Sequence, residues 1–113
     1  MRALRTFALV VLAASSIACS VHTLDAEAEK VQVSQNPPPA GCTRLDFLTG
    51  HSGGPLGGAF VPNDDLIDWA MDDLRNQAAQ RGATYVQYDT PQMGDSDGTT
   101  TTVTITGTAH RCP

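Results

Sequence analysis

Residues 63–88 constrain the fold more than any other part of the chain. Apolar side chains recur there at three- and four-residue spacing, so they share one face of a predicted helix. These side chains are Ile67, Ala70, Met71, Leu74 and Ala78. We expect Asn63 to cap the start of the helix and Gly82 to end it in the left-handed conformation. The β-branched and aromatic residues of 83–88 then predict a strand.

Short extended segments surround this helix–strand unit. Alternating or apolar residues predict strands over 31–33, 43–49 and 99–110, and glycine and proline predict loops over 50–58 and 91–98. The last strand alternates two sets of residues, Val103, Ile105, Gly107 and Ala109 against Thr102, Thr104, Thr106 and Thr108. The order β-β-α-β-β with short connections favours antiparallel pairing. Residues 31–113 therefore predict an α+β domain, a two-layer sandwich with one helix on one face of a mostly antiparallel sheet.

The first eighteen residues indicate export. They have a basic start at Arg2 and Arg5, a short apolar run and a small-residue end, which are the features of a signal peptide. A cysteine follows directly, as in bacterial lipoprotein signals, so we expect cleavage before Cys19 and lipidation of its thiol. Residues 19–30 are then a lipidated tether or a short helical turn. The residue after Cys19 is Ser20 and not the Asp that retains lipoproteins at the inner membrane, which favours the outer membrane. The alternative is an ordinary signal peptide that happens to contain a cysteine.

Charge and cysteine content limit the partners and the compartment. The formal net charge is -5, and removing Arg2 and Arg5 with the leader lowers it to -7. Such a chain is not expected to bind nucleic acid or to dock electrostatically on anionic lipid. With Cys19 assigned to lipidation at the end of the leader, Cys42 and Cys112 remain near the two ends of the folded part, and they should pair in an oxidising compartment. A bridge closing so long a loop adds about 4 kcal/mol in the chain-entropy model.

Four features carry a resemblance to a known family. They are the lipoprotein leader, Cys42 just before a strand, the run LRNQAAQRGATYV at 74–86, and the terminal GTAHRC that ends at Cys112. Together they resemble DUF4156, a family of small bacterial lipoproteins of unknown function, and they are similar in pattern to the outer-membrane stress sensor RcsF. The resemblance implies a small α/β domain, an envelope location and a Cys42–Cys112 bridge.

Motifs for catalysis or metal binding are weak in this chain. Two histidines, His51 and His110, could join Cys42 and Cys112 as metal ligands, but the spacing matches no standard zinc pattern. His51-Ser52 lacks the surroundings of a nucleophile elbow, and the calcium-like Asp95-Ser96-Asp97-Gly98 has Thr106 where an EF-hand needs Glu. We therefore expect no enzyme activity, cofactor or metal. The alternative is a periplasmic metal-binding protein or small enzyme that uses the two histidines.

The exterior of the predicted helix offers a candidate partner contact. Trp69 projects roughly opposite Ile67 and Leu74, at about 100° per residue, among acidic side chains. The candidate contact residues are Trp69, Asp65, Asp68 and Asp72. The alternatives are a solvated acidic face, and a tryptophan that folds over a sheet edge or under the 50–58 loop. The sequence thus predicts a non-catalytic interaction or stress-related module, anchored to the outer membrane through Cys19, on its periplasmic or surface-exposed side, with an envelope protein as partner.

Overall fold

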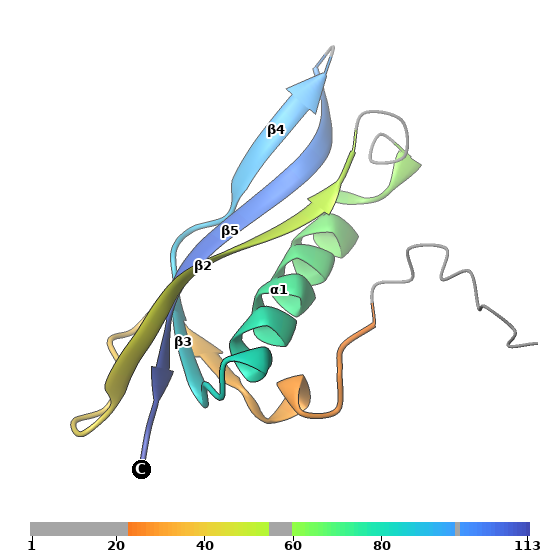
Figure 1. The fold of residues 1–113 in the computed structure, drawn as a ribbon. Helices are drawn as coiled ribbons and strands as arrows, with labels where there is room; N and C mark the ends of the chain where they lie inside the picture. Colours follow the sequence, from red (N-terminus) through yellow and green to blue (C-terminus); the bar gives the residue numbers. More distant parts are fainter. Residues whose placement is uncertain (1–22, 55–59, 97) are drawn as a thin grey trace, which may run out of the picture.

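One helix covers one face of a five-stranded, mostly antiparallel sheet (Figure 1). The computed structural model describes residues 23–54, 60–96 and 98–113. The strands are β1 (Gln32–Ser34), β2 (Thr43–Gly53), β3 (Tyr85–Tyr88), β4 (Gln92–Ser96) and β5 (Thr99–Arg111), the helix is α1 (Asn63–Gln80), and a 3-10 turn, η1 (Ala28–Lys30), precedes β1. The α+β prediction is confirmed.

The long strand β5 organises the sheet. The order is β1-β3-β5-β2, and β4 pairs with β5 as well. β3 pairs with the C-terminal part of β5 and β4 with its N-terminal part, whereas β2 pairs along most of its length. β1 is parallel to β3, and the other pairings are antiparallel. The connection from β1 to β2 therefore crosses from one edge of the sheet to the other.

Two predicted loops contain strand residues. Residues 91–98 include β4, and β2 continues through Gly53 into the stretch predicted as a glycine loop; residues 55–59 lie outside the described residues. The loop predictions were wrong for 50–53 and 92–96, because β5 is 13 residues long and offers hydrogen-bond partners to segments whose own composition is poor for strands. Pairing with a long neighbour overrides local strand propensity.

The buried stripe of α1 differs from the predicted one. Leu66, which the sequence pattern left out, is fully buried together with Ala70, Leu74 and Ala78. Ile67 and Met71 are half-buried on the flank of this stripe. The core-facing row therefore has four-residue spacing, and tertiary contact with the sheet decides which apolar residues point inward.

The two ends of α1 also differ in how well the sequence predicts them. Pro62 occupies the N-cap position, and the cap has no side-chain hydrogen bond, so the predicted Asn63 cap is wrong. The C-terminal end agrees with the prediction, since Gly82 has a φ of 74°. The amide of Ala83 donates to the carbonyl of Ala78 at 3.0 Å, and that of Gly82 donates to Ala79 at 3.0 Å. This Schellman pattern ends the helix and directs the chain into β3.

The core lies between α1 and the inward face of β5. Val103, Ile105 and Ala109 are fully buried, and the alternating threonines point to the other face, as predicted. The helix approaches β2 so closely that a Cβ atom on Gly50 would lie 2.3 Å from the carbonyl oxygen of Ala70. Glycine is therefore required there for packing. Among the described residues, no helix is both long enough and apolar enough to cross a membrane.

Candidate docking surfaces and the disulfide corner

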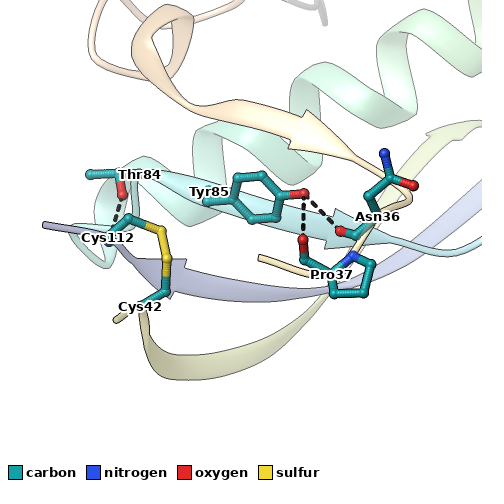
Figure 2. Close-up of a disulfide and its surroundings, with 6 residues drawn as sticks. All are labelled: Asn36, Pro37, Cys42, Thr84, Tyr85 and Cys112. Carbon is teal, nitrogen blue, oxygen red and sulfur yellow. Dashed lines mark hydrogen bonds between the residues drawn. A yellow bond between two sulfur atoms is a disulfide. The ribbon is translucent and has the colours of Figure 1, made fainter. Parts of the chain in front are cut away.

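The disulfide joins the two strand ends at one corner of the sheet. Cys42 precedes β2 and Cys112 follows β5, and the neighbouring residues Thr43 and Arg111 are paired across the two strands. The Cα atoms of the cysteines are 4.1 Å apart. The predicted bridge is therefore present in the structure. The amide of Cys112 also donates to Oγ1 of Thr84 at 2.8 Å, which ties this corner to the start of β3 (Figure 2).

Tyr85 fixes the proline-rich connection between β1 and β2 at the same corner. Its hydroxyl donates to the carbonyl of Asn36 at 2.7 Å (Figure 2). A pocket of about 450 Å³ opens beside it, lined by Gln32, Pro39, Ala40, Thr84, Tyr85, Cys112 and Pro113. The ring centroid of His110 lies 6.3 Å from that of Tyr85. His110 is 8% exposed and its Nε2 atom has no hydrogen-bond partner.

The structure does not bring the sequence-derived metal candidates together. Both cysteines are in the disulfide. His51 pairs in register with Thr104, and His110 pairs with Arg44, so the two histidines are separated by about 20 Å of strand at roughly 3.3 Å per residue. Among the described residues, no group of three or more His, Cys, Asp or Glu side chains is placed to hold a metal ion.

His51 and Ser52 do not form a catalytic pair either. Successive residues of a strand point to opposite faces. Ser52 is buried and donates its hydroxyl to the carbonyl of Leu66 in α1. The His51 ring lies on the other face, with Nδ1 3.4 Å from Oγ1 of Thr104. The calcium-like stretch is part of the β4–β5 hairpin, and its Asp97 lies outside the described residues.

Side chains of α1 cover the outer edge of β2, which the sequence did not predict. Asp73 accepts the amide of His51 at 2.8 Å, and the amide group of Gln77 donates to the carbonyl of Thr49 at 2.7 Å. Backbone groups at a sheet edge otherwise invite pairing with another chain. Asp73 and Gln77 are four residues apart beside the buried stripe, but a sequence cannot show which strand edge lies next to them.

The face of the sheet that α1 does not cover is a candidate docking surface. We call it the open face; the register places on it Thr104, Thr106 and Thr108 of β5, Phe47, Thr49 and His51 of β2, and Gln87 of β3. Phe47 is 55% exposed. These side chains present hydroxyl, amide, imidazole and phenyl groups, which can donate and accept hydrogen bonds and pack on a partner. The threonine row is thus part of a surface several strands wide.

The predicted contact on the helix exterior is only partly accessible. Asp65 and Asp68 are exposed, and Asp72 is half-buried. Trp69 is half-buried and packs against the hydrophobic core, so it is not an exposed anchor. Of the candidate residues on α1, the two exposed acids remain available to a partner. Cys19 lies outside the described residues.

The fold and its corner define a small, disulfide-closed α+β domain with one helix-covered face and one open face. The family model for a domain of unknown function (DUF4156) matches residues 22–112, and the chain belongs to this family. The match therefore includes the segment before β1 and both disulfide cysteines. Neither the curated proteins nor the solved structures include a significant match to the chain.

Proposed function

We propose that the mature protein is an outer-membrane lipoprotein, anchored by acyl chains on Cys19, and that its domain is a non-catalytic interaction or stress-related module of the envelope. The observation that carries this proposal is the Cys42–Cys112 bridge in the domain that follows a lipoprotein-type leader. Disulfides persist in oxidising compartments such as the bacterial periplasm. The stress-related part rests on the sequence pattern alone, in which the leader, Cys42, the 74–86 run and the terminal GTAHRC resemble RcsF.

The open face supports an interaction role. Phe47 is 55% exposed there, and its register partner on β5 is Thr108. An exposed aromatic side chain among hydrogen-bonding groups is a common anchor for partner binding. On α1, in contrast, Trp69 is engaged with the core. The partner of this proposal is therefore an envelope component that contacts the open face, with Asp65 and Asp68 as the alternative contact.

Intact mass of the protein purified from membranes tests the anchor and the bridge together. We expect cleavage before Cys19, added acyl mass, and a mass increase on reduction that corresponds to one disulfide. An unlipidated, soluble product would overturn the outer-membrane part of the proposal. Free thiols in the untreated protein would overturn the compartment argument.

Site-specific photocrosslinking in intact cells tests the docking surface. A crosslinking residue in place of Phe47 should give a discrete adduct, and the same residue in place of Asp65 serves as the matched control on the other side of the domain. Loss of the adduct in a Thr106→Lys variant, which places charge on the same face, would confirm specificity. A discrete adduct from position 65 alone would instead favour the acidic helix surface.

A further inference from the structure

The segment that leads to the proposed lipid anchor is fastened to α1. Asn76 makes two hydrogen bonds with its backbone: Nδ2 donates to the carbonyl of Thr23 at 2.9 Å, and Oδ1 accepts the amide of Asp25 at 2.9 Å. Arg75 donates from Nη2 to the carbonyl of Glu29 at 2.9 Å. Ala28, between these contacts, is fully buried. Residues 23–30, the N-terminal segment, are therefore part of the folded domain.

The contacts lie on the side of α1 that faces away from the sheet. Asn76 and Arg75 are roughly 120–140° around the helix from the centre of the buried stripe, at about 100° per residue. In Figure 1 the N-terminal segment, coloured orange, runs along α1 on the side opposite β2 and β5. The chain thus enters the domain from the helix side, whereas the open face lies on the other side of the sheet.

The covalent distance from Thr23 to the proposed anchor is short. Ser20, Val21 and His22 are the residues between Cys19 and Thr23. A fully extended chain spans at most about 3.6 Å per residue, so the Cα atoms of Cys19 and Thr23 lie within about 14 Å of each other. If the N-terminal segment were released, the next fixed residue would be the buried Val31, and the reach would grow to about 40 Å.

We infer that Asn76 and Arg75 set the orientation of the domain on its membrane, with the outer side of α1 facing the lipid surface and the open face pointing away from it. This inference rests on the proposed lipid anchor at Cys19. The surface that the outer side of α1 faces is the bilayer that holds the acyl chains. Asp65 and Asp68 are exposed on α1, so charge does not draw this side towards anionic headgroups, and the orientation comes from the short covalent link alone. The covalent link therefore orients the domain, and the open face stays accessible to a partner in the aqueous space.

Fluorescence quenching on the lipidated protein tests the orientation. A fluorophore is placed on Asp68→Cys, on the outer side of α1, or on Phe47→Cys, on the open face, and the mature lipoprotein is reconstituted in vesicles whose headgroups carry a quencher. We expect stronger quenching at position 68 than at position 47. Adding Asn76→Ala together with Arg75→Ala should abolish this difference, because both sets of hydrogen bonds to the N-terminal segment are then lost and the domain turns on a longer tether. Gln80→Ala, which removes an exposed amide from the same helix, should leave the difference intact.

Each other outcome contradicts a specific step. Equal quenching at both positions in the otherwise unchanged protein, or stronger quenching at position 47, would overturn the orientation. A difference that survives Asn76→Ala together with Arg75→Ala, in protein with an unchanged melting temperature, would overturn the role of these two side chains. Failure of both labels to associate with vesicles, in protein without acyl mass, would overturn the proposed anchor and the inference with it.

Discussion

The two ends of β5 show how unevenly this domain is held together. At the C-terminal end, β5 lies between β2 and β3, and the disulfide, the Thr84 hydrogen bond and the Tyr85 hydrogen bond all join neighbouring segments. We call this the stapled end. At the other end, β4 and the first residues of β5 form a hairpin that extends past α1 (Figure 1), and Met93 is 47% exposed. We call this the hairpin end.

Strand sequence alone does not determine the local stability of this domain. β5 keeps the same alternation of apolar and threonine residues through both ends. What differs is the cross-links, which lie at the stapled end, and the first two residues of β5, Thr99 and Thr100, which pair with β4 alone. Regions with few buried contacts open more readily than the core. Substitutions at the stapled end and under α1 should therefore cost more than matched substitutions at the hairpin end. The predictions below use the mature chain with Cys19→Ser as background, so that unfolding can be measured in solution.

Removing the bridge should have the largest effect. Cys42→Ser with Cys112→Ser opens a loop with a sequence separation of 70 residues, and the chain-entropy model predicts a loss of about 4 kcal/mol in the free energy of unfolding. Urea unfolding followed by circular dichroism measures the loss. Reduction of the unsubstituted protein should produce a similar shift. If neither treatment moves the urea midpoint, the stapled end does not owe its stability to the bridge.

Gly50→Ala should be next in size. The added Cβ atom would lie 2.3 Å from the carbonyl oxygen of Ala70 and 2.9 Å from the amide nitrogen of Leu74, both backbone atoms of α1. The helix must then move off the sheet, and overpacking of this kind costs about 3 kcal/mol or more. Urea unfolding again gives the number. A loss below about 1 kcal/mol would mean that α1 shifts without losing its packing on Leu48 and Ile105, which are buried in the core with the inward residues of α1.

The features that local sequence encodes were predictable. The helix, its glycine end, the strand after it and the alternation in β5 all depend on residues within a few positions of each other, so periodicity is sufficient to find them. The bridge could also be predicted, because Cys42 and Cys112 are the cysteines that remain once Cys19 is assigned to the lipid anchor. Fold class followed from the order of these elements.

The missed features depend on contacts between distant residues. β4 forms because β5 extends beyond β3, and Leu66 is buried because of where α1 meets the sheet. The bonds from Asn76 to Thr23 and Asp25 join residues about fifty positions apart. The open face is defined by strand register, which also separates His51 from His110. A single sequence contains no direct signal for any of these.

Tyr85→Phe should have a moderate effect at the stapled end. The substitution keeps the ring but removes the 2.7 Å hydrogen bond to the carbonyl of Asn36, and a bond of this kind contributes about 1 kcal/mol. Tyr88→Phe, on the same strand, is the matched control. Hydrogen exchange should also show faster exchange at Thr84 and Cys112, whose amides lie at this corner. Equal losses for the two variants would indicate that the Tyr85 hydroxyl does not hold the proline-rich connection.

Gly94→Ala should have the smallest effect, although the substitution is the same as at Gly50. Its Cβ atom would lie 2.3 Å from Oγ1 of Thr102, but this atom ends a short side chain that can rotate away. Alanine also loses less backbone entropy than glycine on folding, by roughly 0.5–1 kcal/mol within a strand. The two terms offset each other, so we expect a change within about 0.5 kcal/mol in urea unfolding. A loss as large as that of Gly50→Ala would mean that the hairpin end is as tightly constrained as the region under α1, and that the disulfide and the helix are not what makes the two ends different.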